Sequence, residues 1–240
     1  MSSPRKKQSR RTSRSTPAER LGGGTEIRAS RYIGTKSLRI IGGDLRRRSV
    51  TYNGDRATRP MKDSVRENLF NILGPGIKGT VAWDLFAGTG ILAIEALSRG
   101  AVHAIAIDSS RGCTRSIRQS ADALSVSQRL EVLQGDTFRL AALRLPHAPD
   151  QRRVVFCCPP YRMWESHQEQ LFELVQMSFA GAAAGSIIVC EMDRKCDPAI
   201  LPEAQWDIRQ YGIVTLAFAE VISPSGDDAP SDDNTQSAVK

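Results

Sequence analysis

The stretch Asp84-Leu85-Phe86-Ala87-Gly88-Thr89-Gly90 decides the fold of this chain. It follows the apolar run 81–83, which is typical of a buried strand, and it precedes the periodic segment 91–99, which predicts a helix. Glycines at such a turn let the backbone bend sharply and approach a ligand without a Cβ in the way. The stretch therefore predicts a cofactor that lies over a strand-to-helix turn.

Strands and helices alternate beyond this turn. Strands are predicted at 101–107, 130–133, 154–157 and 186–190, and helices at 110–124 and 165–179. The last two strand-like runs, 205–211 and 213–221, are separated only by Gly212 and must pair antiparallel at one edge of the sheet. We therefore predict an α/β fold in which a doubly wound, mostly parallel sheet carries a C-terminal antiparallel hairpin and binds its ligand at the carboxyl ends of the strands.

A small separate hairpin and a helix are predicted ahead of this sheet. The runs 38–41 and 46–51 flank Gly42-Gly43-Asp44 as two short strands, and the segment 61–73 predicts a helix. The buried side of this helix is expected to carry Val65, Leu69, Ile72 and Leu73, and its outward side Lys62 and Arg66.

The positive charge of the chain is unevenly distributed. The 240 residues have a formal net charge of +7, and residues 1–31 alone hold nine Lys or Arg against two acidic residues. A second basic window, 36–66, holds nine Lys or Arg against three Asp. Such clusters attract phosphate backbones, and a solvated charged face is the ordinary alternative.

Composition divides the chain into four segments. We predict a disordered basic tail at 1–36, an RNA-facing hairpin and helix at 37–75, an α/β domain at 76–222 and a disordered acidic tail at 223–240. No apolar run approaches the roughly 18 to 20 residues of a membrane helix. Five cysteines without a CxxC pair suggest neither a disulfide framework nor a metal site. We expect a cytoplasmic protein that uses no membrane and no metal.

Acidic residues after the next two strands complete a nucleoside site. Asp108 ends the second strand, where its carboxylate can accept hydrogen bonds from both hydroxyls of a ribose. Asp136, in Gly135-Asp136-Thr137, follows the third strand and could take the amino group of an adenine. Residues 88–93 also match the G-x-G-x-x-A pattern, so an NAD-dependent oxidoreductase is an alternative. The acid at Asp84, the closing hairpin and a Pro-Pro-Tyr stretch after the fourth strand favour S-adenosylmethionine instead.

That stretch, Cys158-Pro159-Pro160-Tyr161, should face the methyl donor across the same sheet edge. The carbonyls of two stiff proline residues can accept hydrogen bonds from an exocyclic NH2 group, and Tyr161 can stack on a flipped base. Positioning the nitrogen is then the main catalytic contribution. The alternatives are a rigid loop with a core tyrosine, or a thiolate at Cys157 or Cys158 that adds to a pyrimidine. For Cys157 we expect packing within the strand.

Four motifs together point to a family. They are Arg39-Ile40-Ile41-Gly42-Gly43, Thr58-Arg59-Pro60, the 84–90 turn and Glu95-Ala96-Leu97-Ser98-Arg99-Gly100-Ala101. Over about 38–221 the chain resembles the RsmD-type methyltransferases, which act on 16S ribosomal RNA. The resemblance implies a class I, Rossmann-like S-adenosylmethionine-dependent methyltransferase domain at 76–222. It also implies transfer of a methyl group to N2 of one guanine in an assembled or assembling small ribosomal subunit.

The resemblance and the residue patterns together suggest a role for each candidate residue, and we expect a monomer because the substrate is a large particle. The cofactor would be bound by Asp84, Phe86, Gly88, Thr89, Gly90, Asp108, Asp136 and Thr137. The target base would be held by Cys158, Pro159, Pro160 and Tyr161. The RNA phosphates would be contacted by Arg39, Arg46, Arg47, Arg48, Arg59, Lys62 and Arg66.

One position departs from the family pattern. The family has Asp-Pro-Pro where this chain has Cys158-Pro159-Pro160, and a neutral thiol is a weak hydrogen-bond acceptor. Losing a charged hydrogen bond of about 1.5–3 kcal/mol would slow transfer roughly ten- to a hundredfold or more. A lesser departure is Ser120, which stands about where the family usually has Asn. Cys158 motivates a second hypothesis, a catalytically weakened RNA-binding assembly factor that still holds the cofactor.

Overall fold

The computed structural model describes residues 36–52, 54, 58–147 and 151–222. The segments predicted as tails lie outside these residues, except for Lys36. Within the described ranges, no helix is long and apolar enough to cross a membrane.

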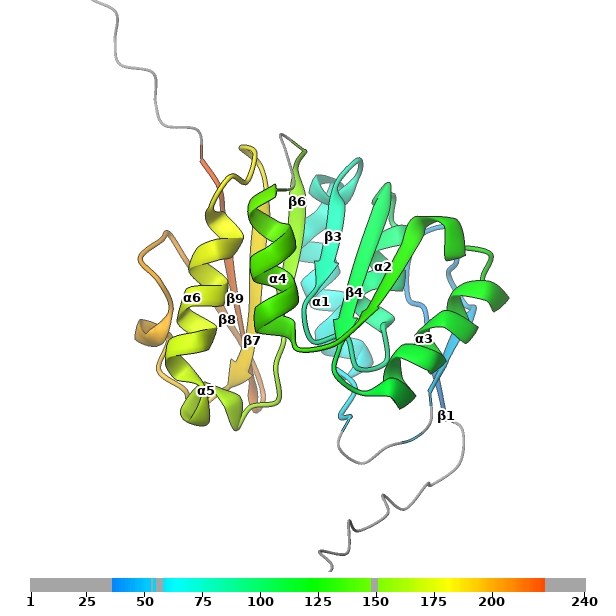
Figure 1. Ribbon diagram of the computed structural model, residues 1–240, viewed down its shortest axis with the longest axis horizontal. Coiled ribbons are helices and arrows are strands. Elements are labelled where there is room, and N and C mark those ends of the chain that lie inside the picture. Colours follow the sequence, from blue (N-terminus) through cyan, green and yellow to red (C-terminus); the bar gives the residue numbers. More distant parts are fainter. Residues whose placement is uncertain (1–35, 53, 55–57, 148–150, 223–240) are drawn as a thin grey trace, which may run out of the picture. The chain divides into compact units, whose positions relative to one another are not determined.

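A seven-stranded sheet forms the core of the described part (Figure 1). Its strands lie in the order β5-β4-β3-β6-β7-β9-β8, and neighbours from β5 to β7 are parallel. β9 pairs antiparallel with both β7 and β8, so the closing hairpin lies at one edge as predicted. The strand bounds are β3 Val81–Asp84, β4 His103–Asp108, β5 Leu130–Gln134, β6 Arg153–Cys157, β7 Ile187–Asp193, β8 Asp207–Tyr211 and β9 Val214–Glu220.

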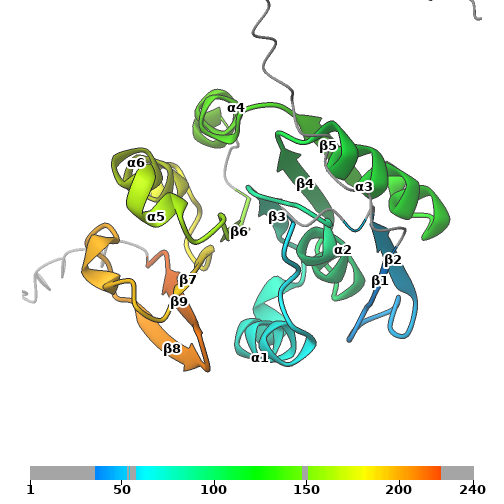
Figure 2. The same ribbon diagram turned by 90° about the horizontal axis from the view of Figure 1, so that it is seen from below.

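Helices cover both faces of this sheet, because its strands are apolar on both sides (Figure 2). In β6, Val154 and Phe156 join one hydrophobic cluster, whereas Val155 and Cys157 join the other. The first cluster includes buried residues of α1 Asp63–Leu73, α2 Ile91–Ser98 and α3 Arg111–Ala123. The second includes those of α4 Thr137–Arg144, α5 Met163–Ser166 and α6 Gln168–Phe179. Short 3-10 turns lie at Gly74–Ile77, Ser127–Arg129, Leu145–His147 and Pro198–Ile200.

Two helices differ from the sequence prediction. The helix expected at 165–179 is split into α5 and α6 at His167, whose φ of −136° is not helical. The ring of His167 stacks on Phe138, with 6.3 Å between ring centroids. The second difference is α4, which the periodicity did not reveal. Its N-cap is Asp136, whose side chain accepts a hydrogen bond from the backbone N–H of Arg139.

The predicted N-terminal hairpin is present, with β1 Lys36–Arg39 antiparallel to β2 Ser49–Tyr52. Its connection is longer than expected and packs onto the end of α2. The hydroxyl of Ser98 donates to the carbonyl of Gly42 at 2.6 Å and accepts from the N–H of Leu45 at 2.9 Å. A Cβ on Gly43 would lie 1.8 Å from the carbonyl oxygen of Ser98. The hairpin loop is therefore in close contact with α2.

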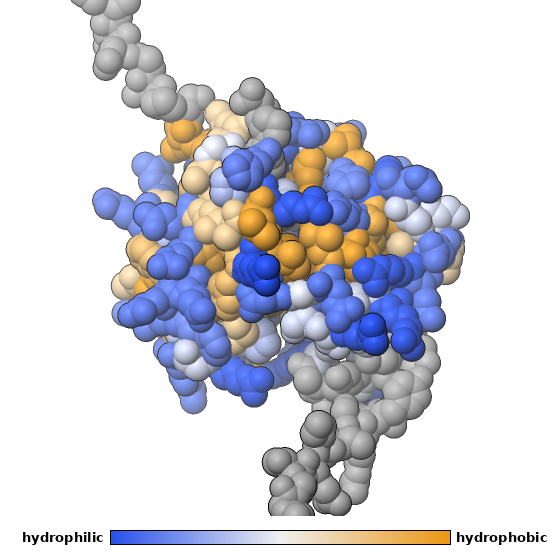
Figure 3. Space-filling model, viewed as in Figure 1, coloured by the Kyte–Doolittle hydropathy of each residue, from blue (hydrophilic) through white to orange (hydrophobic). Residues whose placement is uncertain are grey.

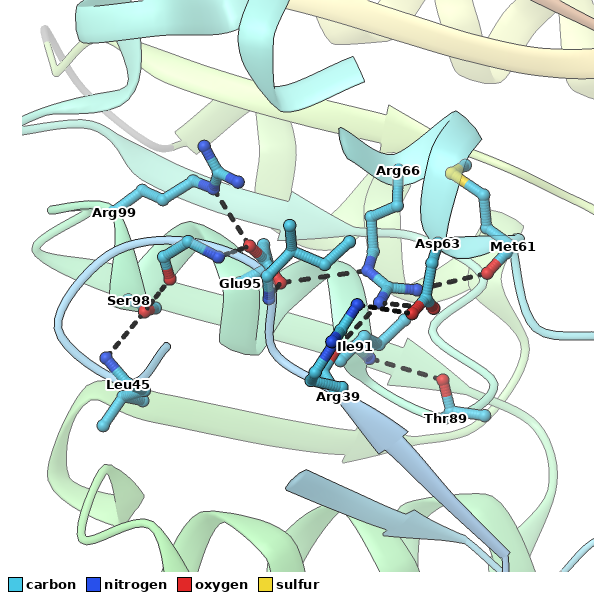
Figure 4. Close-up of polar contacts among 12 residues, drawn as sticks. Arg39, Leu45, Met61, Asp63, Arg66, Thr89, Ile91, Glu95, Ser98 and Arg99 are labelled. Atoms are coloured by element: carbon cyan, nitrogen blue, oxygen red, sulfur yellow. Dashed lines mark hydrogen bonds and ion pairs between the residues drawn. The ribbon is translucent and has the colours of Figure 1, made fainter. Parts of the chain in front are cut away.

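Glu95, in the middle of α2, holds the start of the same loop (Figure 4). Its side chain is fully buried and accepts hydrogen bonds from the N–H groups of Ile41 at 3.0 Å and Gly42 at 2.7 Å. It also pairs with Arg99 at 3.0 Å and, more distantly, with Arg66 at 3.8 Å. This carboxylate therefore joins the hairpin, α1 and α2.

The predicted faces of α1 are wrong at two positions. Arg66, expected to point outward, is fully buried. Its guanidinium donates to the carbonyl of Arg39 at 2.7 Å and to Asp63 at 3.0 Å, because the hairpin covers this side of the helix. Ile72, expected on the buried side, is 38% exposed. Helical periodicity locates the apolar face of a helix, but the neighbouring hairpin decides which residues beside that face are buried.

Candidate active site

A cavity of about 700 Å³ opens at the carboxyl ends of the parallel strands, within the range typical of small-molecule sites. Asp84 from β3, Asp108 from β4 and Glu191 from β7 all line it. Of the sequence-predicted residues, the lining contains Arg59, Lys62, Asp84, Phe86, Gly88, Thr89, Asp108, Asp136, Thr137, Cys158, Pro159, Pro160 and Tyr161. The fold thus brings the two predicted halves of the site, the glycine turn and the Pro-Pro-Tyr stretch, to one cavity.

The glycine turn has the backbone geometry that its residues favour. Gly88 has a φ of +52° and Gly90 a φ of +73°, a region that residues with side chains rarely adopt. A Cβ on Gly90 would lie 2.8 Å from Cγ1 of Ile117 in α3. Asp108 braces the turn, because its Oδ2 accepts a hydrogen bond from the N–H of Gly88 at 2.7 Å and its Oδ1 accepts one from Ser110 at 2.8 Å. Each carboxylate oxygen keeps a second lone pair that can face a ligand hydroxyl.

Asp84 is buried beneath this turn with half of its carboxylate unsatisfied. Its Oδ2 accepts a 3.3 Å hydrogen bond from the N–H of Ala93, whereas its Oδ1 has no partner among the described residues. The pKa of Asp84 is raised to about 7, because burial, together with the smaller effect of the Asp108 charge, outweighs the hydrogen bond from Ala93, which lowers it. A ligand that brings a positive charge or an N–H donor would satisfy this group.

The residues after β5 shape another wall of the cavity. Asp136 caps α4 through its Oδ1, which accepts from the N–H of Arg139 at 2.9 Å. The hydroxyl of Thr137 donates to the carbonyl of Leu85 at 2.6 Å and ties this wall to the glycine turn. Phe86 meets Phe138 edge to face, with 6.1 Å between ring centroids. Together these groups give this wall of the cavity a polar edge and an aromatic surface.

The stretch after β6 leaves one backbone acceptor available. The carbonyl of Pro160 accepts a hydrogen bond from the N–H of Met163 at 2.8 Å. The carbonyl of Pro159 accepts none from the residues that the structure describes. A donor on a bound base could use it.

Glu191 is a cavity residue that sequence reasoning missed. It lies inside β7, one residue beyond Cys190, which pairs in register with Cys157 of β6. Its Oε1 accepts a hydrogen bond from the hydroxyl of Tyr161 at 2.7 Å. Burial raises the pKa of Glu191, while the Tyr161 hydrogen bond and the Arg59 guanidinium lower it. An acid within an otherwise apolar run was the only sequence signal.

The cysteines do not fit the thiolate alternative. Cys157 is fully buried in β6, which confirms the expected strand packing. Burial, followed by the negative charge of Glu191, raises the pKa of the Cys158 thiol well above its usual range. A protonated thiol is a poor nucleophile, so a covalent step at this residue is disfavoured.

The predicted RNA-binding residues divide into three groups. Arg59 and Lys62 line the cavity, and Arg39, Arg46, Arg47 and Arg48 are exposed on or near the hairpin. Arg66 is buried, so its predicted role as a phosphate contact is withdrawn. Three further basic residues, Arg111, Arg115 and Arg118, are exposed on α3. The outward side of α3 is hydrophilic in Figure 3, whereas hydrophobic side chains reach the surface between α3 and α4.

Comparisons with known proteins agree with this arrangement. A family model described as conserved hypothetical protein 95 matches residues 38–220. YlbH of Bacillus subtilis strain 168, provisionally described as an rRNA methyltransferase, is 32% identical over 190 residues, which are 75% of this chain and 97% of the relative. Ribosomal RNA small subunit methyltransferase D of Haemophilus influenzae is 33% identical over 182 residues, with 74% of this chain and 91% of the relative covered. The solved structure of yhhF from Escherichia coli, provisionally described as a methyltransferase, has a TM-score of 0.63 and 26% identity over 78% of this chain and 99% of that chain.

Proposed function

Because the chain belongs to the RsmD-type family, described as conserved hypothetical protein 95, we propose that it transfers a methyl group from S-adenosylmethionine to the exocyclic N2 of a guanine in small-subunit ribosomal RNA. The observation that carries the proposal is the single cavity shared by the glycine turn and the Cys158–Tyr161 stretch. Such a cavity can hold a nucleoside cofactor beside a base. The sheet, with its antiparallel closing hairpin, is the class I methyltransferase fold.

The residues around the glycine turn fit the cofactor. S-adenosylmethionine, when bound, supplies a methyl carbon on a positively charged sulfur that needs no further activation. Asp108 can accept the ribose hydroxyls, and Asp136 can accept the adenine amino group while it caps α4. The unpartnered oxygen of Asp84 is the acceptor that a cationic or N–H-bearing part of the cofactor would satisfy. The NAD alternative is less well supported, because the comparisons point to methyltransferases.

Cofactor affinity is expected to rise as the pH increases through about 7, the pKa of Asp84 in the ligand-free protein. The reason is that the ionised carboxylate attracts a cationic ligand, so affinity should change roughly tenfold across the two pH units around this value. Isothermal titration calorimetry would measure this change. In Asp84→Asn, affinity should be lower and nearly independent of pH over this interval. A wild-type affinity that does not vary with pH would contradict this role of Asp84.

The stability of the ligand-free protein should follow the opposite trend. The folded-state pKa of Asp84 is raised above its unfolded value of 3.8, so its contribution to stability is fully present below 3.8 and is lost as the pH rises through about 7. Asp84→Asn should therefore unfold at a higher temperature than the wild type above neutral pH when no cofactor is present. Thermal melts with and without cofactor would separate the two effects.

The groups after β6 would position the target nitrogen. The free carbonyl of Pro159 can accept an N–H from an amino group, and the ring of Tyr161 lies on the wall of the same cavity. Stacking on Tyr161 would hold the base so that its amino group faces the methyl carbon, which is the geometry that transfer requires. The phosphates would be contacted by the basic residues that are exposed, Arg39, Arg46, Arg47, Arg48, Arg59 and Lys62.

Tyr161→Ala is expected to slow methyl transfer roughly ten- to a hundredfold, the cost of losing one base stack. Cofactor affinity should stay within about twofold of the wild type, because this residue lies on the base side of the cavity. Tyr161→Phe is the matched control, since it keeps the ring and should retain more transfer than the alanine variant. Transfer by the alanine variant at the wild-type rate would remove Tyr161 from base binding.

The proposal is tested by incubating the protein with labelled S-adenosylmethionine and small ribosomal subunits that lack the modification. Mass spectrometry of the digested nucleosides should then find N2-methylguanosine.

Cys158 favours the second candidate, an RNA-binding assembly factor with a weakened site. For that candidate, cofactor binding without any methylated nucleoside is expected, and Cys158→Asp should increase transfer.

A further inference from the structure

The base side of the cavity contains a carboxylate that the Cys158-Pro159-Pro160-Tyr161 stretch does not itself provide. Glu191 belongs to β7, the strand beside β6, and lines the same cavity as Cys158 and Tyr161. Its negative charge is close enough to Cys158 to raise the pKa of the thiol. The acid missing from position 158 thus has a counterpart on the adjacent strand.

Glu191 is held in place from two sides. The hydroxyl of Tyr161 donates to its Oε1 at 2.7 Å. The indole N–H of Trp164 donates to its backbone carbonyl at 2.8 Å. The first bond orients the carboxylate and the second holds the backbone beneath it. An acceptor oriented in this way loses little conformational freedom when it binds a ligand, so a hydrogen bond to it can discriminate between ligands.

Half of this carboxylate remains available. Among the described residues, Oε2 of Glu191 accepts no hydrogen bond, although Oε1 does. Besides Tyr161, the Arg59 guanidinium influences the pKa of Glu191, and Glu191 in turn influences that of the Cys158 thiol; of these last two groups only Arg59 is a strong donor. A carboxylate can only accept hydrogen bonds, so the cavity favours a ligand group that donates, such as NH2, over a carbonyl or a bare C–H.

We propose that Glu191 is the specificity-determining residue of the base site, whose Oε2 accepts a hydrogen bond from the target amino group. This inference rests on the proposed function, since it concerns the base that the same cavity would admit. It gives Glu191 the acceptor role that Cys158 cannot fill. Tyr161 then has two tasks, because its ring faces the base and its hydroxyl orients the acceptor.

The inference is tested by comparing guanosine with inosine, which differs from it only by lacking the N2 amino group. Dissociation constants would be measured by ligand-observed NMR with S-adenosylhomocysteine present. The wild type should bind guanosine roughly tenfold or more tightly than inosine, the size expected for a hydrogen bond to a charged group. Glu191→Gln keeps one acceptor without the charge and should show a smaller preference. Glu191→Met keeps the length without an acceptor and should show none.

Two controls make the result specific. Glu169→Gln removes an exposed carboxylate from α6 and should keep the full preference for guanosine. A general packing defect would weaken both nucleosides together, so the ratio of the two constants reports only the amino group. A wild type without preference, or a Glu191→Met variant that keeps it, overturns the inference. The transfer assay is read separately: no methylated nucleoside with wild-type protein removes the proposed function and this inference with it, whereas transfer with an unchanged ratio in Glu191→Met removes the inference alone.

Discussion

Replacing Glu95 with alanine is expected to lower the free energy of unfolding by about 3–5 kcal/mol, the usual cost of breaking a buried ion pair by removing one partner. The side chains of Glu95 and Arg66 are both fully buried, so the variant would leave the positive charge of Arg66 in the core without this buried negative partner. It would also remove the acceptor for two loop N–H groups, those of Ile41 and Gly42. Chemical denaturation of wild type and variant would measure the difference.

Asp63→Ala is the matched comparison, because Asp63 pairs with the same arginine. Its side chain is 49% exposed, so the variant should cost only about 0–1 kcal/mol. Equal costs for the two variants would show that burial does not govern this network. The loop should also exchange its amide hydrogens faster in Glu95→Ala, since its N–H groups would have lost their acceptor.

Gly90→Ala is expected to weaken cofactor binding by at least roughly tenfold, because two costs act at the cofactor turn together. The first is the positive φ of +73°, worth about 1 kcal/mol or more for a residue with a side chain. The second is the approach of the new Cβ to within 2.8 Å of Ile117, which must shift together with α3. Calorimetry with S-adenosylmethionine would measure the loss.

Gly79→Ala separates these costs. Gly79 has the same φ of +73°, but its Cβ would meet no atom within 4 Å. The free energy of unfolding of this variant should fall only by the cost of the backbone strain, and the variant should bind the cofactor like the wild type. If Gly90→Ala binds the cofactor as tightly as Gly79→Ala, the turn tolerates a side chain and its glycine has another purpose.

Much of the fold and part of the candidate site follow from local pattern. The run 81–83, the glycines after it and the very short gap at Gly212 between the last two predicted strands constrain a parallel sheet with an antiparallel edge. Asp84, Asp108 and Cys158 could be placed together in advance, because parallel strands bring their carboxyl ends to one edge. Their roles in binding remain predictions.

The remaining features depend on contacts between distant segments. Glu191 meets Tyr161 across 30 residues, and the acid within the run 187–193 does not by itself reveal that contact. Arg66 lies on the side of α1 that its sequence marks as polar. That side is buried only because the hairpin packs on it, where the carbonyl of Arg39, 27 residues earlier, accepts a hydrogen bond from Arg66. α4 is short, and the sequence pattern around its cap residue Asp136 indicates a ligand group and not a helix start.

The eight residues of α2 act as a spacer between the glycine turn and the hairpin loop. The helix begins directly after Gly90, in the glycine turn, and ends at Ser98, where the hairpin loop is bound. At about 1.5 Å and 100° per residue, inserting or deleting a single residue would swing the basic loop through more than a quarter of a turn around the helix axis. Under the proposed function, the reach from the methyl donor to the phosphate contacts would be set by a residue count, and the number of residues in α2 would constrain the choice of nucleotide as directly as the chemistry of the cavity.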